Sequence, residues 1–400
     1  MTFKVEVLGL GYIGLPTAAI IASNNIPVIG IDVKQDVVNI VNRGNIHIIE
    51  PELEGLVKSV VDKKLLKAQL QPEPADVFII AIPTPFMDDY HPDVTFVENA
   101  IESILPYIRE GNLIIIESTC PVGTTEHMAE RIFRRNPELK DKIFIAYCPE
   151  RVLPGNVIYE LVHNDRIVGG IDAISTQKAF DFYKLFIKGG IHQTNARTAE
   201  MCKLVENSFR DVNIAFANEL SIICDKANIN VWELIKLANY HPRVNILQPG
   251  TGVGGHCIAV DPWFLISEFS DESILIKTAR QRNLYKTKWV INKITNEISN
   301  FGRKPIVAFM GLSFKPNIDD IRESPALEVF NHFYRTNLCT CLAVEPNLQK
   351  LEDIPLSAYD VAIEQADIIV FLVAHNVFKN LKISENKKIL DFCGVRTQKE

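Results

Sequence analysis

The chain has 400 residues, 47% hydrophobic and 23% charged, a globular composition that excludes disorder as its main feature. At roughly 150 residues per domain, this length predicts two or three domains. The 42 Lys and Arg against 49 Asp and Glu leave a net charge of −7. That balance argues against a nucleic-acid partner, because a phosphate-binding surface is normally basic.

The longest apolar stretch, Val7–Ala22, is shorter than the ~20 residues that a membrane-spanning helix needs. Lys4 and Glu6 lie too close to it for the core of a signal peptide. We therefore expect a cytoplasmic protein that does not associate with membranes. Eight scattered cysteines without a C-x-x-C pair predict thiols outside disulfides and no metal site.

Short apolar runs alternate with helical patterns through the first half of the chain. The expected strands are Val5–Leu8, Val28–Ile31, Val77–Ile82, Leu113–Ile116 and Phe144–Ala146, and the expected helices include Gly14–Ser23 and Phe96–Ile108. Near-continuous apolar strands that alternate with helices are typical of a parallel, doubly wound sheet. This part of the chain is predicted to be a Rossmann-like domain.

The pattern changes at about Arg197, where a long stretch without Pro or Gly predicts one helix as far as Asn228. Further helices are expected from Val231 and over Ser273–Asn300. Strand–helix alternation resumes with Ile306–Met310, Pro325–Tyr334, Leu338–Val344, Ile368–Val373 and Lys388–Asp391. The expected architecture is α/β, with two Rossmann-like doubly wound domains (1–196 and 303–400) joined by a helical core (197–302).

A G-x-G-x-x-G motif, Gly9, Gly11 and Gly14, lies between the first strand and the first helix. Gly9 permits the turn, Gly11 lets the backbone approach a pyrophosphate, and Gly14 lets helix and strand pack closely. Asp32 ends the second strand, where its carboxylate would accept from both ribose hydroxyls and repel a 2′-phosphate. The motif therefore predicts NAD as cofactor. The alternative is a purely structural turn.

Four segments, the first of which contains this glycine motif, occur in the order of the nucleotide-sugar 6-dehydrogenases, and the resemblance covers essentially the whole chain. They are Gly9 to Pro16, Glu117-Ser-Thr119-Cys-Pro-Val-Gly123, Cys148-Pro-Glu150-Arg151 and Gly254-Gly-His-Cys257. Residues 199–211, 241–250 and 257–263 resemble the branch of this family that oxidises UDP-N-acetyl-D-mannosamine. Val260 lies where the UDP-glucose branch usually has lysine, which counts against glucose as the sugar.

The resemblance implies that a primary alcohol at C6 becomes a carboxylate, a four-electron oxidation that uses two NAD⁺ in turn. A thiolate suits this chemistry, because it adds to the aldehyde to give a thiohemiacetal that yields the second hydride and leaves a thioester. Cys257 is the candidate nucleophile, since it follows the glycine-rich segment 252–255 where backbone can approach a substrate. The alternative is an inert buried cysteine, which suits most of the others.

Lys203 and Asn207 lie four residues apart on the long predicted helix and therefore share a face. They could stabilise the developing alkoxide or thiohemiacetal oxygen, with Asp261 holding Lys203 or a water in place. By resemblance, Glu150 is the base that activates water on the thioester and Thr119 orients that water. The alternatives are a solvated helix face and a surface glutamate at a strand end.

Further residues are expected to contact the cofactor and the substrate. Cofactor contacts are assigned to Gly9, Gly11, Tyr12, Ile13, Gly14, Asp32, Pro83, Thr84 and Thr119. Substrate contacts are assigned to Arg151, Val152, Lys203, Asn207, Arg210, His241, Arg243, Gly254, Phe314, Lys315, Arg322 and Arg396. By resemblance, 303–400 holds the UDP, and Arg243 crosses a homodimer into the neighbouring sugar site. An ordinary charged surface is the alternative for these basic residues.

Three other functions stay open. UDP-N-acetylglucosamine would keep the chemistry and change the sugar. A catalytically silent nucleotide-binding regulator would keep the fold, although the set Lys203, Asn207, Cys257, Asp261 and Glu150 argues against it. A two-electron hydroxyacid dehydrogenase would explain neither the cysteine nor the second α/β domain.

Overall fold

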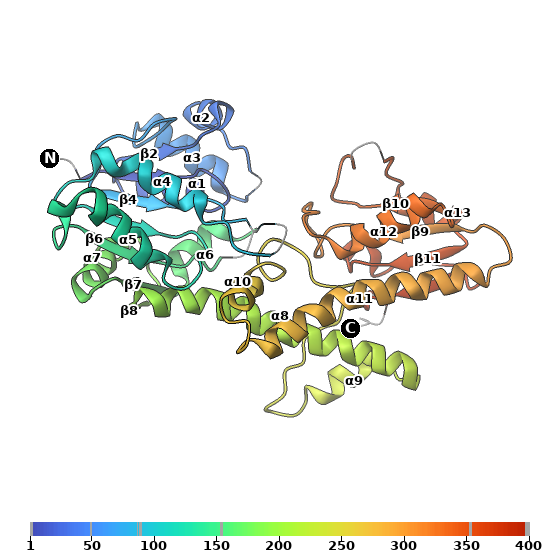
Figure 1. The fold of residues 1–400 in the computed structure, drawn as a ribbon. Coiled ribbons are helices and arrows are strands. Elements are labelled where there is room, and N and C mark those ends of the chain that lie inside the picture. The colour runs from blue at the N-terminus through green and yellow to red at the C-terminus, as the bar shows by residue number, and fades with distance from the viewer. Residues whose placement is uncertain are drawn as a thin grey trace. The chain divides into compact units, whose positions relative to one another are not determined.

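The computed structural model describes residues 3–48, 50–85, 87, 90–152, 155–351 and 354–396. The chain divides into two compact units, Met1–Val205 and Glu206–Glu400 (Figure 1). The boundary between them lies within the long helix α8 (Ala196–Ala227). The division into three domains that the sequence suggests stays a prediction.

The first unit is built on an eight-stranded sheet with the order β3-β2-β1-β4-β5-β6-β7-β8. All neighbouring strands are parallel except β6 and β7, which are antiparallel. The strands are β1 (Val5–Leu8), β2 (Val28–Ile31), β3 (Leu66–Gln69), β4 (Val77–Ile80), β5 (Leu113–Ile116), β6 (Phe144–Tyr147), β7 (Arg166–Gly170) and β8 (Ile191–Asn195). The order of the first six strands is that of a dinucleotide-binding Rossmann fold.

Helices cover both faces of this sheet, which confirms the doubly wound arrangement (Figure 1). One core lies under α1 (Gly14–Ser23), α2 (Gln35–Asn42), α3 (Leu53–Asp62), α6 (Val157–His163) and α7 (Ala173–Tyr183). The other lies under α4 (Thr95–Ile104), η1 (Leu105–Tyr107), α5 (Thr124–Arg135) and η2 (Pro137–Leu139). The central strands β1, β4 and β5 are buried along their whole length, because helices cover both of their faces.

The second unit begins with helices. The second half of α8 is followed by α9 (Val231–Ala238), α10 (Asp261–Glu268) and α11 (Ile274–Ser299). The predicted long helix, the helix from Val231 and the helix over Ser273–Asn300 are thus confirmed. Asn230 caps α9 by accepting the N–H groups of Trp232 and Glu233.

A parallel four-stranded sheet with the order β10-β9-β11-β12 completes the second unit. Its strands are β9 (Ile306–Met310), β10 (Thr340–Val344), β11 (Ile368–Phe371) and β12 (Lys388–Asp391). Side chains of α11 and α12 (Pro325–Thr336) pack on one face, and those of α13 (Tyr359–Gln365) and η3 (Asn376–Phe378) pack on the other. The second Rossmann-like sheet predicted from the sequence is confirmed.

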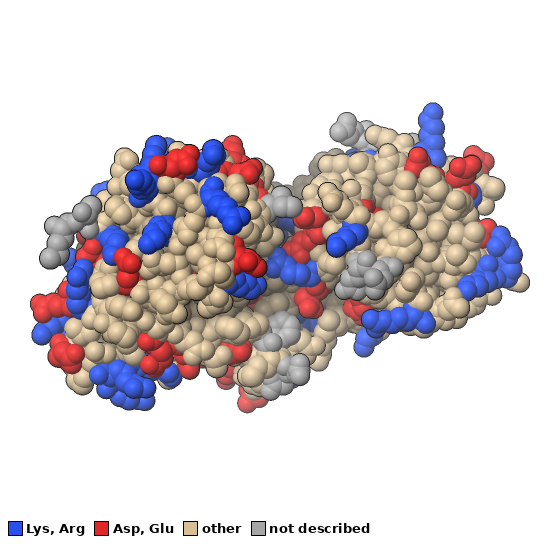
Figure 2. Space-filling view, turned by 90° about the horizontal axis from the view of Figure 1, so that it is seen from above, with Lys and Arg blue, Asp and Glu red and all other residues tan. Residues whose placement is uncertain are grey.

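Lys and Arg are interspersed with Asp and Glu on the face drawn in Figure 2, without a broad area of one sign. Within the described residues, every helix is too short or too polar to cross a lipid bilayer.

Candidate active site

The glycines of the first loop separate into two kinds. Gly9 has φ 92°, and a Cβ there would collide with the Ala81 carbonyl, while a Cβ at Gly14 would collide with the Gly9 carbonyl. Both are glycines because the protein backbone packs against them. A Cβ at Gly11, by contrast, would meet no atom of the described residues within 4 Å apart from those of its chain neighbours. The space beside Gly11 is therefore open to a ligand, as expected for a pyrophosphate.

Asp32 closes the same loop from the end of β2. Its Oδ2 accepts the N–H of Leu10 at 3.1 Å and its Oδ1 accepts the N–H of Lys34 at 2.9 Å. The side chain is half-buried. Each carboxylate oxygen has a further lone-pair direction, so Asp32 can accept ribose hydroxyls while it holds the loop. Exposed Tyr12 and half-buried Ile13 complete the turn before α1.

The segments after β4 and β5 are tied together. The Thr84 hydroxyl donates to the carbonyl of Thr119 at 2.6 Å, and the Ser118 hydroxyl accepts the N–H of Ile82 at 3.0 Å. Pro83 is exposed beside them and Thr119 is half-buried. Both segments lie at the carboxyl ends of parallel strands, the edge at which Rossmann sheets bind ligands.

Glu150 follows β6 and is 6% exposed. Its Oε1 accepts the N–H groups of Arg151 at 2.6 Å and Val152 at 2.7 Å. Its Oε2 makes no hydrogen bond with a described residue and lies 3.6 Å from Arg166 Nη2. One oxygen thus anchors the carboxylate, and the other is left with lone pairs that can accept a proton.

A buried charge cluster behind Glu150 escaped the sequence analysis. Arg166 lies 3.6 Å from Glu117 Oε1, stacks over the Tyr183 ring at 5.1 Å, and donates to Cys148 Sγ at 3.5 Å. Burial raises the pKa of Glu117 to about 7, although Arg166 opposes the shift. Burial also raises the pKa of the Cys148 thiol to about 11.

Glu117 belongs to the same buried cluster. Its side chain is fully buried and accepts the Tyr183 hydroxyl at 2.6 Å. Arg166 is the first residue of β7, whose other residues are apolar or glycine. A charged residue in such a strand was the signal in the sequence from which the buried cluster could have been predicted. Such a residue in a strand core needs a buried partner.

Lys203 and Glu200, both on α8, bind the loops of the first unit. The Lys203 ammonium donates to the Glu150 carbonyl at 2.6 Å and keeps two further N–H groups. Glu200 accepts the N–H of Gly123 at 2.5 Å and both the N–H and the hydroxyl of Thr125. Its carboxylate therefore holds the N-terminus of α5, which begins at Thr124.

In the second unit, Asn207 donates from Nδ2 to Asp261 Oδ2 at 2.5 Å. Both side chains are buried, and Asp261 begins α10. The sequence predicts that Asp261 holds Lys203 or a water; in the structure it accepts from Asn207. The bond fixes which edge of the Asn207 amide faces α10 and directs the start of that helix toward α8.

Cys257 lies between the glycine-rich segment 252–255 and α10. Its side chain is half-buried and forms no disulfide, and its carbonyl accepts the N–H of Asp261 at 2.8 Å. A Cβ at Gly254 would collide with the Glu323 carbonyl, and one at Gly255 would overlap the Phe314 ring. The segment before the cysteine is therefore pressed against the loops that follow β9.

Those loops carry the predicted nucleotide contacts of the second unit. Phe314 and Lys315 are half-buried, and Arg322 is exposed and paired with Asp320 through Nη2 and Oδ2 at 2.5 Å. The Arg322 carbonyl accepts the N–H of Gly255 at 3.1 Å. The second unit thus brings Gly254, the cysteine segment and the predicted diphosphate segment together.

Other predicted substrate contacts are dispersed on the surface of their units. The Arg151 guanidinium donates to the Asp165 carbonyl at 3.1 Å. The remaining exposed positions are Arg210, His241, Arg243 and Arg396. The described part of the chain contains no cluster of side chains suited to a metal ion.

Residues 3–187, 197–285 and 308–397 match, in order, the NAD binding, central and UDP binding domains of the UDP-glucose/GDP-mannose dehydrogenases. The chain belongs to the UDP-glucose/GDP-mannose dehydrogenase family. Its first Rossmann sheet belongs to the NAD binding domain of that family, and the open space at Gly11 beside Asp32 fits this cofactor. NAD⁺ supplies the hydride acceptor when it is bound.

Several relatives resemble this member of the family over nearly their whole length. A UDP-N-acetyl-D-mannosamine dehydrogenase from Campylobacter jejuni is 52% identical over 98% of this chain and 99% of its own. An NDP-N-acetyl-D-galactosaminuronic acid dehydrogenase from Ralstonia nicotianae is 47% identical over 99% and 96%. The structure of a UDP-D-ManNAc dehydrogenase from Pyrococcus horikoshii superimposes with a TM-score of 0.90 at 37% identity, covering 99% of this chain and 97% of that one.

Proposed function

We propose that this enzyme oxidises UDP-N-acetyl-D-mannosamine at C6 to the uronate, with two NAD⁺ reduced for each sugar. The observation that carries the proposal is the likeness over 98% of the chain to a named UDP-N-acetyl-D-mannosamine dehydrogenase. The product is an acidic amino sugar for a surface polysaccharide, made in the cytoplasm from a nucleotide-activated precursor.

Cys257 is the nucleophile of the second oxidation. The first hydride leaves C6 of the alcohol together with a hydroxyl proton, and the aldehyde remains. The thiolate adds to C6 to form a thiohemiacetal, which loses the second hydride and becomes a thioester. Water then breaks the C–S bond and releases the carboxylate and the thiol. The contact of residues 254–255 with Phe314 and Glu323 supports this role, since it joins the cysteine segment to the nucleotide-binding domain.

Lys203 and Asn207 stabilise the oxygen on C6 as negative charge develops. The ammonium keeps N–H donors beyond its bond to the Glu150 carbonyl. The Asn207 amide is oriented by Asp261 and can present its second N–H to an oxyanion. We assign Asp261 the role of holding Asn207, in place of the role first expected from the sequence.

Glu150 is the base that activates water on the thioester, and Thr119 orients that water. Support comes from the two oxygens of its carboxylate, which differ in their surroundings. Oε1 is fixed by two backbone N–H groups, whereas Oε2 makes no hydrogen bond with a described residue. A water that donates to Oε2 would therefore meet an oriented acceptor.

The enzyme acts as a homodimer. Phe209, Phe216 and Ile223 recur every seven residues along α8 and are 69%, 53% and 54% exposed. A stripe of this kind on a single helix is typical of an interface with a second helix. The partner is a second copy of the chain, and Arg243, exposed in one copy, reaches the sugar site of the other.

A substrate panel tests the proposal. NADH release is measured with UDP-N-acetylmannosamine, UDP-N-acetylglucosamine, UDP-N-acetylgalactosamine and UDP-glucose at matched concentrations. We expect the highest kcat/KM with UDP-N-acetylmannosamine. A preference for UDP-N-acetylgalactosamine would move the chain toward its 47% identical relative, and a preference for UDP-glucose would refute the assignment.

A further inference from the structure

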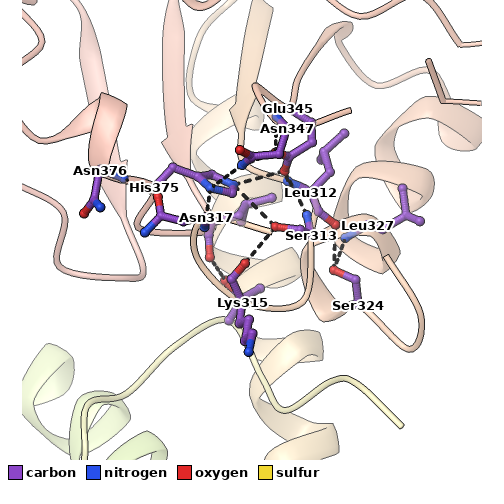
Figure 3. A network of polar contacts seen from close by, with 12 residues as sticks. Leu312, Ser313, Lys315, Asn317, Ser324, Leu327, Glu345, Asn347, His375 and Asn376 are labelled. Carbon is purple, nitrogen blue, oxygen red and sulfur yellow. Dashed lines mark hydrogen bonds and ion pairs between the residues drawn. The ribbon is translucent and has the colours of Figure 1, made fainter. Parts of the chain in front are cut away.

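A buried carboxylate organises the loop that follows β9. Glu345 comes directly after β10 and is 3% exposed. Its Oε2 accepts the N–H groups of Leu312 at 2.7 Å and Ser313 at 3.0 Å, and lies 3.0 Å from His375 Nε2 (Figure 3). One oxygen thus gathers donors from the segments that follow β9 and β11.

His375 carries this contact to the far end of the same loop. Its ring is fully buried, and Nδ1 accepts the backbone N–H of Asn317 at 2.9 Å. A backbone N–H is always a donor, so Nδ1 carries no proton. The hydrogen of the neutral ring is therefore on Nε2, where it is donated to Glu345. The imidazole bridges Glu345 and Asn317 in this tautomer.

Residues 312–317, called the nucleotide loop below, are consequently held at both ends. Leu312 and Ser313 bind Glu345, and Asn317 binds His375. Between these anchors, the Ser313 hydroxyl donates to the Lys315 carbonyl at 2.9 Å. The Lys315 side chain points away from the network (Figure 3), and Phe314 packs over Gly255.

We propose that Glu345 and His375 are positioning residues that hold the nucleotide loop in the conformation that binds the UDP diphosphate. This inference rests on the proposed function, which assigns Phe314 and Lys315 to the substrate. Both residues of the pair are buried and act through the backbone of the loop. A loop that is already ordered loses less conformational entropy when its ligand binds.

Two His375 variants separate the two bonds of the imidazole. His375→Gln carries an N–H donor near the place of Nε2 but has no acceptor at the place of Nδ1. His375→Asn keeps an acceptor near Nδ1 but is too short to reach Glu345. UDP alone is the probe, with its Kd measured by calorimetry on the full chain. We expect each variant to weaken UDP binding about tenfold or more.

Three further readouts separate positioning from a general structural role. The Kd for NAD should stay within about twofold of the unmodified enzyme, because its domain contains neither residue. The KM for the UDP-sugar should rise while kcat at saturation is retained. Amide hydrogen exchange should accelerate in residues 312–317 and stay unchanged in β9.

Phe378→Leu is the matched control. Phe378 contacts the His375 ring with centroids 5.3 Å apart, and its side chain can make no hydrogen bond to the nucleotide loop. This variant disturbs the same core and should retain UDP affinity. An equal loss of UDP affinity in Phe378→Leu would show that general packing is responsible, and would overturn the inference.

Asn347→Ala supplies an independent test should the His375 variants fail to fold. Asn347 is exposed, and its amide donates to Glu345 Oε1 at 3.2 Å and lies 3.0 Å from His375 Nδ1. We expect UDP affinity to fall about threefold, because the network loses one of several contacts. Unchanged UDP affinity in every folded variant of His375 and Asn347 would contradict the positioning role. If the unmodified enzyme itself failed to bind UDP, the proposed function would be wrong instead.

Discussion

Glu345 occupies the position in the second sheet that Asp32 occupies in the first. Each follows the strand that pairs with the first strand of its Rossmann unit. Asp32 accepts the N–H of Leu10, and Glu345 accepts the N–H of Leu312. Both loops begin with a left-handed glycine at the end of a strand, with φ 92° at Gly9 and 90° at Gly311.

The two carboxylates differ in their access to a ligand. Asp32 is half-buried and can still accept from a ribose, whereas Glu345 is buried beneath His375. The first sheet therefore uses its acid to hold its loop, and we propose that the same acid recognises the dinucleotide. The second sheet uses its acid to hold the loop after β9 and to bind His375 and Asn347.

Replacement of Asp32 should change cofactor preference. In Asp32→Ser, the ribose loses a charged acceptor and a 2′-phosphate is no longer repelled. Loss of hydrogen bonds to a charged group removes about 1.5–3 kcal/mol, so kcat/KM with NAD should fall roughly 10–100-fold. Activity with NADP should rise. Asp36→Ser, the same change of charge at an exposed position on α2, should leave both values unchanged.

The roles proposed for Cys257 and Glu150 predict different fates for the substrate. In Glu150→Gln, the amide oxygen can still accept the N–H groups of Arg151 and Val152, but water is not activated. This variant should release up to two NADH per site and then stop with the UDP-uronyl group on Cys257. Cys257→Ser should show no adduct and lose overall turnover by orders of magnitude, since a hydroxyl is a poorer nucleophile.

Intact-protein mass spectrometry detects the adduct directly. Cys341→Ser is the control, because Cys341 is half-buried in β10 and has no proposed role. It should turn over normally in the unmodified background and keep the adduct when combined with Glu150→Gln. Steady turnover of Glu150→Gln without an adduct would show that hydrolysis uses another base.

Glu117 should make stability depend on pH in a defined direction. Burial raises its pKa to about 7 from 4.5, so the folded chain keeps this proton at pH values where the unfolded chain has lost it. The contribution of Glu117 to stability is therefore largest below about pH 4.5 and is lost as the pH rises toward 7. Glu117→Gln cannot ionise, so its stability should not fall with rising pH for this reason.

The measurement is the thermal unfolding midpoint of both proteins at pH values from about 5 to 8. As the pH rises, the unfolding midpoint of Glu117→Gln should increase relative to that of the unmodified chain. Glu110→Gln, at an exposed position, should show no such trend. A constant difference for Glu117→Gln across this range would contradict the raised pKa.

The proposed dimer predicts that two inactive variants restore each other. Arg243→Ala should lack the residue that reaches the neighbouring site, and Cys257→Ser should lack the nucleophile. A mixed dimer would contain one site with Cys257 and the partner's Arg243, so activity should return on mixing. Continued inactivity after subunit exchange would place Arg243 within its own subunit.

The interface itself can be tested by charge. Phe216→Glu puts a carboxylate in the centre of the exposed stripe on α8 and should yield monomers in analytical ultracentrifugation. Tyr159→Glu is the matched control, at a 57% exposed aromatic residue on α6. Dimers of Phe216→Glu that are as stable as those of the control would exclude the stripe as the interface.

Central strands and long helices were predictable from the sequence for simple reasons. β4 and β5 are buried on both faces and appear as continuous apolar runs, and α8 contains neither proline nor glycine. The strands β3 and β8 lie at the edges of the first sheet and were missed. Their sequences Leu-Lys-Ala-Gln and Ile-His-Gln-Thr-Asn are mostly polar, because one side of an edge strand faces solvent.

Site residues divide in the same way. Gly9, Gly11 and Cys257 lie in local motifs whose spacing carries their chemistry. Arg166 and His375 act through partners on strands distant in the sequence, and local spacing holds no record of such pairs. Only the folded sheets bring each of these side chains to its partner.

The stoichiometry of oxidation tests the central claim most directly. A limiting, known amount of UDP-N-acetylmannosamine is converted to completion with excess NAD⁺, and NADH is counted by absorbance while the product is identified by mass. The cysteine route predicts two NADH for each sugar, a UDP-uronate product and no free aldehyde. One NADH for each sugar together with an aldehyde product would contradict it.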